Sequence, residues 1–416
     1  MKVLLLGGGG REHALGWKLA QSPVLTALVS APGNPGLAEL GRCITSIDIT
    51  DAAAVTDLAA TEAADLVVIG PEAPLAAGVA DALGAAGVPV FGPGAAAARL
   101  ESSKAFAKEV MRTAGVATAA AEVFTDPAGA AAHLAGRSGP YVVKADGLAA
   151  GKGVLVTEDL EAATAWAAAC LTGRFGEAGS AVVIEDHLDG DEVSVLAVCH
   201  GETALTLEAA RDYKRIGDGD TGPNTGGMGC YSPPRHLPEG LVAATRDDVI
   251  QPVLRELSRR GIPYTGFLYA GLVLTADGPR VLEFNCRLGD PETQVLMPRL
   301  ASDLLTVLAA AAAGEPIDSP LEWHEDAAVD VVLASPGYPV GSVSGLPISG
   351  DLSAGGDVLV FHAGTRYGDG GLETSGGRVL NVVGVGPDVA TARKRAYERA
   401  GQIDFEGKQM RSDIGN

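Results

Sequence analysis

The chain has 416 residues, of which 47% are hydrophobic, and its formal net charge is −21. This length predicts roughly three domains with apolar cores, and the negative charge argues against nucleic acid or an anionic membrane as a partner. Five scattered cysteines without a Cys-x-x-Cys pair, and no apolar run long enough to span a bilayer, predict a cytoplasmic protein without a zinc site.

The first hundred residues carry the pattern of a doubly wound α/β domain with a parallel sheet. An apolar strand at residues 2–6 runs into the segment 7–13, which opens with four glycines, and then into an Ala/Leu-rich helix. His13 stands where the third glycine of a dinucleotide loop would be, so we expect a phosphate near Arg11 rather than a dinucleotide. Later strands end at Asn34 and Glu72, where ligands of such sheets bind, although tight turns alone would explain the same glycines and prolines.

A Gly-rich hairpin is predicted at residues 141–156, with Lys144 and Lys152 on either side of the turn. Lys152 precedes Gly153 rather than Ser or Thr, so the turn is not a Walker A loop. Backbone N–H groups of such a turn can approach phosphate oxygens closely, and this favours a lid over a nucleotide. An ordinary flexible hairpin is the alternative.

Three segments that follow contain charged or Gly-rich sequences. A strand at 182–188 leads to an acidic connector ending in Glu192, which suits a purine edge and a ribose but also an ordinary solvated turn. The basic run at 211–215 supplies local cations that the overall charge lacks. The loop at 223–229 is too Gly-rich for a core element.

The most informative strand ends in Glu283 and Asn285. Side chains alternate along a strand, so these two face one side while Leu282 and Phe284 pack on the other. Paired oxygen ligands of this kind hold Mg²⁺ together with nucleotide phosphates, and Arg287 could clamp an anionic substrate group. The segment predicts a metal-nucleotide site, although a lone Glu-x-Asn at a strand end is more often solvated.

A polar, Pro-bearing linker at 314–326 precedes a small α+β domain. Its strands are expected at 329–334, 358–363 and 379–385, and its helix at 389–400. The predicted domains are an N-terminal substrate domain at 1–100, a central domain at 101–313 with a lid subdomain at about 120–190, and a C-terminal domain at 327–416.

In chain order, six motifs resemble those of the phosphoribosylamine-glycine ligases, a family of the ATP-grasp superfamily, and the resemblance covers the whole chain. The motifs are GGREHA at 9–14, GPEAPL at 70–75, KADGLAAGKGV at 144–154, DTGPNTGGMG at 220–229, TGFLYAG at 265–271 and EFNCRLGDPE at 283–292. The chain departs from the family at Gly8, where Asn is usual, and at Tyr213, where His is frequent.

The resemblance implies an ATP-grasp core and a reaction of purine biosynthesis. ATP phosphorylates the carboxylate of glycine, and the amine of 5-phosphoribosylamine attacks the acyl phosphate. The products are glycinamide ribonucleotide, ADP and phosphate. Catalysis of this kind depends on charge neutralisation and positioning by a metal and fixed cations. We expect a monomer acting on these small molecules.

Residue roles follow from the same resemblance. Mg²⁺ or Mn²⁺ is expected at Glu283 and Asn285. The ATP set is Lys104, Lys144, Gly151, Lys152, Gly153, Glu185, Leu188 and Glu192. The substrate set is Gly10, Arg11, Glu12, Asn34, Glu72, Asp212, Asn224, Gly226 and Arg287, and the catalytic residues are Arg287, Lys152 and Asp212.

Two other classes of protein share part of this pattern. Another ATP-grasp enzyme, such as a carboxylase subunit or a phosphoribosyl carboxyaminoimidazole synthase, would share the lid and the metal strand but lack the run at 220–229. A non-enzymatic nucleotide-binding regulator would keep the nucleotide pocket but could lose Glu283, Asn285 or Arg287, and all three are present.

Overall fold

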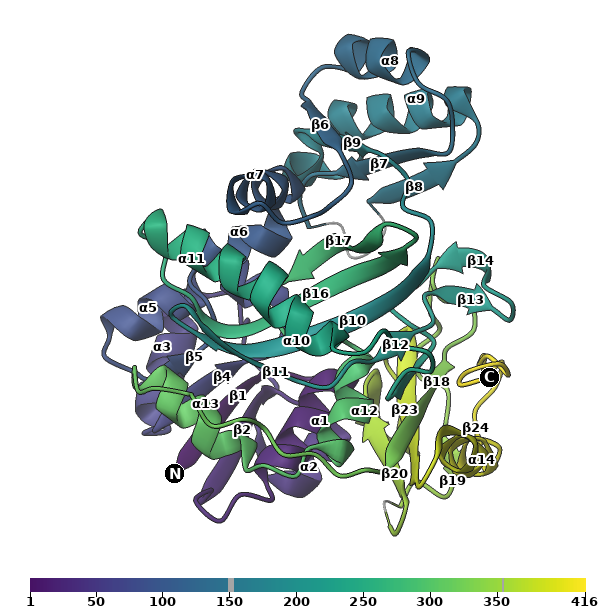
Figure 1. The fold of residues 1–416 in the computed structure, drawn as a ribbon. Helices are drawn as coiled ribbons and strands as arrows, with labels where there is room; N and C mark the ends of the chain where they lie inside the picture. The colour runs from purple at the N-terminus through teal and green to yellow at the C-terminus, as the bar shows by residue number, and fades with distance from the viewer. Residues whose placement is uncertain (149–152, 354) are drawn as a thin grey trace.

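The computed structural model describes residues 1–148, 153–353 and 355–416. Four β-sheets with their helices form an N-terminal unit, a lid unit, a central unit and a C-terminal unit (Figure 1). The three-part α/β and α+β architecture predicted from the sequence is confirmed. Within the described residues, no helix is both long and apolar enough to cross a membrane.

The N-terminal unit is a doubly wound domain around a parallel five-stranded sheet in the order β3-β2-β1-β4-β5. Residues 3–6 of β1 are fully buried, as expected for a central parallel strand covered on both faces. Its strands are β1 (Lys2–Gly7), β2 (Ala27–Pro32), β3 (Arg42–Cys43), β4 (Leu66–Ile69) and β5 (Val90–Phe91). Its helices are α1 (Gly10–Leu19), α2 (Pro35–Leu40), α3 (Ala52–Thr61), α4 (Glu72–Ala76), α5 (Val79–Ala85) and α6 (Ala95–Ser102).

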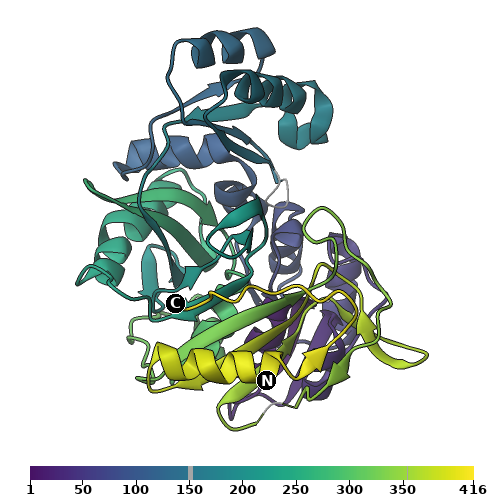
Figure 2. The ribbon, with the colours of Figure 1, turned by 90° about the vertical axis from the view of Figure 1, so that its right-hand side faces the viewer.

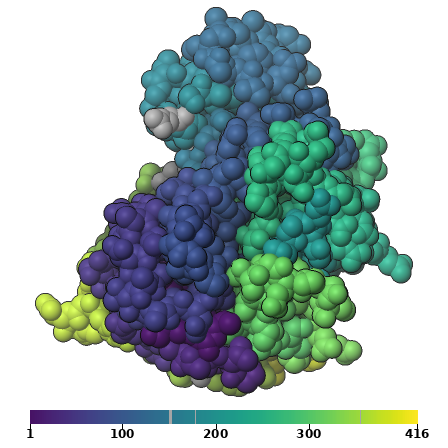
Figure 3. Space-filling view, turned by 90° about the vertical axis from the view of Figure 1, so that its left-hand side faces the viewer, coloured from purple at the N-terminus to yellow at the C-terminus, as the bar shows by residue number. Residues whose placement is uncertain are grey.

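The lid unit projects from the rest of the molecule, as Figures 1 and 3 show. Helix α7 (Lys104–Ala114) leads into it, and its antiparallel sheet has the order β6-β9-β7-β8. The predicted strands on either side of the Gly-rich turn pair as a hairpin, β7 with β8. The bounds are β6 (Ala121–Phe124), α8 (Pro127–Ala135), β7 (Tyr141–Ala145), β8 (Val154–Thr157), α9 (Leu160–Ala169) and β9 (Val182–Glu185).

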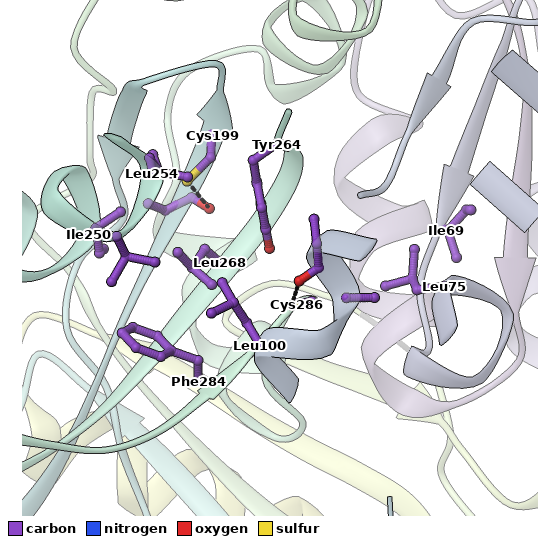
Figure 4. Packing of buried hydrophobic residues seen from close by; sticks show 14 of the residues in the cluster. Ile69, Leu75, Leu100, Cys199, Ile250, Leu254, Tyr264, Leu268, Phe284 and Cys286 are labelled. Atoms are coloured by element: carbon purple, nitrogen blue, oxygen red, sulfur yellow. Dashed lines mark hydrogen bonds between the residues drawn. The ribbon is translucent and has the colours of Figure 1, made fainter. Parts of the chain in front are cut away.

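The central unit has an antiparallel sheet in the order β11-β10-β16-β17. Alternate residues of β16 enter different cores: Leu268 packs in the cluster shown in Figure 4, with Leu254 and Leu100, and Phe267 packs in the other. Both cores include strands of the N-terminal unit, so the two units pack as one body. The bounds are β10 (Asp191–His200), β11 (Thr203–Thr206), α10 (Leu241–Thr245), α11 (Gln251–Arg259), β16 (Thr265–Thr275), β17 (Gly278–Asn285), α12 (Glu292–Arg299) and α13 (Leu304–Ala312).

The C-terminal sheet crosses the boundary that the sequence predicted. Its order is β12-β15-β18-β23-β20, and its first two strands come from the segment before the linker. Its bounds are β12 (Arg211–Asp212), β15 (Gly229–Ser232), β18 (Ala327–Ala334), β20 (Val358–His362), β23 (Arg378–Gly386) and α14 (Val389–Ala400). Three small ladders add β13 (Arg215–Gly217) with β14 (Thr221–Asn224), β21 (Thr365–Gly368) with β22 (Gly371–Thr374), and β19 (Ser349–Gly350) with β24 (Ile403–Asp404).

Candidate active site

The metal-binding residues predicted on β17 lie within a group of cations. No hydrogen bond or ion pair engages the Glu283 carboxylate within the described residues. Burial opposes its ionisation, but Lys214, Lys144 and Lys104 outweigh burial and lower the pKa of Glu283. An ionised carboxylate without such a partner, next to the Asn285 amide, fits a divalent cation, whose remaining ligands would be phosphate and water. No cluster of three or more His, Cys, Asp or Glu in the described ranges competes for this role.

Lys104 lies at the mouth of the lid hairpin. Its Nζ is 3.3 Å from the carbonyl oxygen of Gly147 and 3.5 Å from that of Asp146. Burial lowers the pKa of Lys104, and the Glu283 carboxylate opposes that shift. Within the described residues Lys104 contacts carbonyl groups alone, so it is available to an incoming phosphate, which is a better partner for its charge.

Arg287 connects the metal strand to the N-terminal unit. Its guanidinium lies 3.2 Å from Glu72, 3.0 Å from Glu101 and 3.3 Å from the Asn285 side-chain oxygen. Burial disfavours the charge, but the two carboxylates outweigh burial and raise the pKa of Arg287. The side chain of Glu101 is 7% exposed. Glu101 was not predicted, because nothing in its own segment indicates that the chain folds it onto Arg287.

Arg11 and Glu12 lie in the first turn of α1, a little earlier than the helix start expected after His13. Glu12 accepts a hydrogen bond from the Gly9 amide at 2.8 Å, and Arg11 donates to Glu12 at 2.5 Å. Arg11 also lies 3.9 Å from Glu72. The cation therefore stands at a helix N-terminus, where backbone N–H groups and the helix dipole favour an anion.

Two predicted substrate residues at the same edge, Asn34 and Gly10, have structural partners, as does Gly8. The Asn34 side chain caps α2 by accepting from the Leu37 amide at 2.9 Å. It also donates to the carbonyl oxygens of Gly8 at 2.9 Å and His362 at 2.7 Å. A Cβ at Gly8 would lie 2.3 Å from the carbonyl oxygen of Gly33, and one at Gly10 would lie 2.3 Å from the Asn381 amide. These glycines permit close packing, whatever they do for a ligand.

The predicted adenine and ribose residues lie at the junction of the lid and central units. Glu185 is 2% exposed and is held between Lys144, with which it forms a close ion pair, and Lys108 at 2.6 Å. Leu188 is half-buried, and Glu192 pairs with Lys214 at 2.6 Å. Lys108 was missed, although it lies one helical turn after Lys104 on α7 and this spacing is a usable signal.

Asp212, on β12, faces several acids and one base. Burial raises the pKa of Asp212 to about 7; Lys214 opposes the rise, and Glu292, Glu192 and Glu283 add to it. Such a group exchanges its proton near neutral pH, as a general acid or base must. Glu292 and Lys214 therefore belong to the site, although neither was in the predicted set.

The 224–227 loop is tied to the C-terminal unit. The Gly226 amide donates to the Tyr338 hydroxyl at 2.8 Å, and Arg378 donates to the Gly226 carbonyl oxygen at 2.5 Å. Arg378 also pairs with Asp290 at 3.1 Å. Asn224 is exposed on β14. Arg378 was not predicted, because its segment carries no motif and only the tertiary fold brings it to this loop.

Two residues predicted to bind ATP, Gly151 and Lys152, lie outside the described residues. Gly153 is described, and its carbonyl oxygen accepts from the Ala145 amide at 2.8 Å. This bond closes the base of the hairpin next to Lys144.

Comparisons with known proteins identify the family. Models of the phosphoribosylglycinamide synthetase N domain, ATP-grasp (A) domain and C domain match residues 1–101, 102–293 and 328–416. A phosphoribosylamine–glycine ligase of Rhizobium meliloti is 49% identical over 415 residues, which span 100% of this chain and 98% of the relative. One of Streptomyces coelicolor is 52% identical over 419 residues, with the same coverage of 100% and 98%.

Solved structures agree. A phosphoribosylamine–glycine ligase of Thermotoga maritima has a TM-score of 0.87 at 36% identity, over 99% of this chain and 100% of that one. The biotin carboxylase domain of a Hydrogenobacter thermophilus 2-oxoglutarate carboxylase shares the fold, with a TM-score of 0.76 at 16% identity over 98% and 91%. The chain therefore belongs to the phosphoribosylglycinamide synthetase family of ATP-grasp ligases.

Proposed function

We propose that the chain ligates glycine to 5-phosphoribosylamine with cleavage of ATP to ADP and phosphate. The observation that carries the proposal is the uncommitted Glu283 carboxylate beside Asn285, among Lys104, Lys144 and Lys214 and next to Arg287. Such a site gathers anions that would otherwise repel one another: a triphosphate, a carboxylate and the acyl phosphate formed from them.

Glu283 and Asn285 would hold the divalent metal, Mg²⁺ or Mn²⁺, and ATP would bind between the lid and central units. The metal supplies positive charge at the phosphates. Lys104 and Lys144 would neutralise phosphate oxygens, together with Lys152, Gly151 and Gly153 of the hairpin. Glu185, Leu188 and Glu192 would bind the adenine and ribose.

The reaction takes place in two displacements. A carboxylate oxygen of glycine attacks the γ-phosphorus, the bond to the β-phosphate oxygen breaks, and ADP leaves. The amine nitrogen of 5-phosphoribosylamine then attacks the carbonyl carbon, and phosphate leaves as the amide forms. Arg287 would bind the glycyl phosphate. Asp212, whose pKa is about 7, would accept the proton that the amine loses.

The phosphoribosylamine would bind at the carboxyl edge of the N-terminal sheet. The start of α1, with Gly10, Arg11 and Glu12, favours the phosphate group. Glu72 lies between Arg11 and Arg287 and joins this subsite to the reacting centre. Asn34 would shape the edge, and Asn224 and Gly226 would close the centre from the other side.

A three-substrate assay tests the proposal. Purified protein is incubated with Mg²⁺ and with ATP, glycine and freshly made 5-phosphoribosylamine, and then with each substrate omitted in turn. We expect ADP only when all three substrates are present. AMP as the stoichiometric product, or ADP formation that does not depend on glycine, would exclude the reaction.

We also propose a monomer in a reducing compartment, the cytoplasm. All five cysteines are free thiols, and four of them are buried. Size-exclusion chromatography with light scattering tests the monomer, and localisation of a tagged chain tests the compartment.

A further inference from the structure

The segment at residues 411–415 lies against the β13–β14 hairpin, next to β12, which carries Asp212. Figure 2 shows the yellow end of the chain running past α14 to this region. Arg411 is only 1% exposed, although its side chain is among the largest in the protein. It donates to both oxygens of Asp413, at 2.7 and 2.6 Å, and to Asp220 at 2.7 Å.

The buried Arg411 stacks on Tyr213. Its guanidinium carbon is 4.7 Å from the centre of the tyrosine ring, within the range of a cation–π contact. The Tyr213 hydroxyl also accepts a hydrogen bond from the Gly415 amide at 3.0 Å. Tyr213 is therefore held at its face and at its hydroxyl by the same short segment.

The 411–415 segment is itself fixed. Ile414 is fully buried in a cluster with Tyr231 of β15. Arg393 of α14 donates to the carbonyl oxygens of Ser412 at 2.6 Å and Ile414 at 2.9 Å. Ser412 donates from its amide to Asp218 at 2.8 Å, between β13 and β14. The segment thus ties the hairpin to α14.

Because Tyr213 lies between Asp212 and Lys214 in the chain, holding Tyr213 also holds these two residues. Side chains alternate along an extended strand, so Asp212 and Lys214 face the site while Tyr213 between them faces Arg411. The Tyr213 amide donates to the Gly229 carbonyl oxygen at 3.0 Å, and its own carbonyl oxygen accepts from the Met228 amide at 2.8 Å. A shift of the ring would therefore move the two site residues on either side of it.

We propose that Arg411 is a positioning residue: with the 411–415 segment it clamps Tyr213 and so holds Asp212 and Lys214 in place for the ligation. The inference rests on the proposed role of Asp212 at the reacting centre. It assigns a role in the reaction to a segment that contacts no proposed substrate group.

Two conservative variants test the clamp. Arg411→Lys keeps the charge near Asp413 and Asp220 but loses the planar, stacked guanidinium. Tyr213→Phe keeps the stacked ring but loses the acceptor for the Gly415 amide. We expect each variant to lower kcat about ten- to a hundredfold, because small displacements of reacting groups are costly. The KM for ATP should stay within about twofold, since the lid and β17 bind the nucleotide.

Arg395→Lys is the matched control. Arg395 lies on α14, pairs with Asp357 at 2.7 Å, and serves the same unit without touching Tyr213. We expect its kcat to stay unchanged, and its melting temperature to fall less than that of Arg411→Lys, because Arg395 is partly exposed and Arg411 is buried. Equal kcat for the two arginine variants would overturn the inference and leave Arg411 a purely structural residue.

Asp212→Asn tests the role of Asp212 separately from the clamp by Arg411. Its kcat should fall at least as far as that of Arg411→Lys. If Asp212→Asn is fully active, the proposed role of Asp212 fails. If Asp212→Asn is inactive while Arg411→Lys and Tyr213→Phe are both fully active, only the clamp fails.

Discussion

Several buried residues in this protein have charged neighbours that shift their pKa values and fix their positions. Arg287 is the clearest case, because one guanidinium serves Glu72, Glu101 and the Asn285 amide together. The planar guanidinium can donate to all three partners in fixed directions, whereas the ammonium of a lysine cannot. The same geometry joins the proposed metal strand to the proposed phosphoribosylamine subsite.

Arg287→Lys is therefore expected to lower kcat about 10²- to 10³-fold, the usual cost of removing a positioned donor from a developing anion. The melting temperature should change little, because the lysine retains the charge between Glu72 and Glu101. Steady-state kinetics at saturating Mg²⁺ and ATP measure the effect. A kcat within threefold of the parent would contradict the assignment.

Asp330 differs from Arg287, because it is a buried acid without an ion-pair partner in the part of the chain that the structure describes. It is fully buried on β18, and no side chain within the described residues donates a hydrogen bond to it. Burial raises the pKa of Asp330 well above its usual value, and Asp290 adds to the rise. Arg378 and the Val382 amide oppose the shift without cancelling it. The carboxyl group therefore keeps its proton to a higher pH than an exposed aspartate does.

The raised pKa of Asp330 has a defined sign for stability. Unfolding lets Asp330 ionise, so the free energy of unfolding falls as pH rises from about 4, where unfolded aspartate titrates, toward the folded pKa. Asp330→Asn mimics the neutral acid and removes the titration. We expect the variant to be more stable than the parent at pH 8 by about 1–3 kcal/mol, with the difference vanishing near pH 4. Urea unfolding at both pH values measures it; a pH-independent difference would contradict the neutral assignment.

At the scale of elements, one buried charge cluster joins three of them. Lys108 of α7 and Lys144 of β7 both pair with Glu185 of β9. The cluster attaches the lid sheet to the helix that leads into it. Lys104, one turn earlier on α7, contacts two carbonyl oxygens at 3.3 and 3.5 Å, and in the described ranges it has no ion pair.

Lys108→Met is expected to destabilise the protein by roughly 1–3 kcal/mol, because Glu185 loses one of two partners in a buried position. Lys104→Met is the control and should leave stability nearly unchanged while it weakens ATP binding. Chemical denaturation and the KM for ATP separate the two effects. Equal stability losses in both variants would show that the cluster is not what holds the lid to α7.

Periodicity predicted most elements but not all of their neighbours. The strand expected at 329–334 and the helix expected at 389–400 are found at Ala327–Ala334 and Val389–Ala400, because alternation and turn residues are local signals. The pairing of β12 and β15 with β18 could not be predicted, since it joins segments far apart in the chain. The site divides in the same way: Glu283 and Arg287 carry local motifs, whereas Arg378 reaches the 224–227 loop only through folding.

At the scale of the whole molecule, the lid unit stands apart from a body whose other units share cores (Figure 1). Among the described residues, its hydrophobic cluster is formed by the lid unit alone. The proposed ATP site lies at the junction, so bound nucleotide would contact both sides of it. Closure of the lid on the nucleotide is the expected response.

Small-angle scattering tests this closure. The radius of gyration should decrease on addition of ATP with Mg²⁺, and glycine alone should not change it. Hydrogen exchange at residues 147–153 should slow under the same condition. An unchanged radius of gyration together with unchanged exchange would contradict a mobile lid.

The interface between the N-terminal and C-terminal units contains two neutral histidines. The His362 amide donates to Nδ1 of His13 at 2.8 Å, which requires that nitrogen to be unprotonated. Burial lowers the pKa of His13 to about 3, with a smaller contribution from His362, and burial lowers the pKa of His362 to about 4. Both rings must gain a proton when the protein unfolds in mild acid.

Stability should therefore be intact above pH 6.5 and decline below it, by up to about 1.4 kcal/mol per pH unit for each histidine. His13→Asn removes one of the two titrations. Its unfolding free energy should fall less steeply between pH 6 and 4 than that of the parent, whatever the absolute stability. Parallel slopes would contradict the assignment of His13 as a buried neutral base.

The sheet that crosses the domain boundary has a consequence for biosynthesis. Strand β12, which carries Asp212, and β15 beside it gain no further strand in their own sheet until β18 has been translated, and β18 pairs with β23 on its other side. Before that, Ala210 ties the start of β12 to Ser194 of β10. The elements proposed to bind the nucleotide are therefore synthesised before the strands that complete the sheet of the reacting centre. We expect a prematurely terminated chain to fold its ATP pocket while β12 and β15 lack the rest of their sheet, so that Asp212 is less firmly held. Such fragments should bind ATP without converting it to ADP.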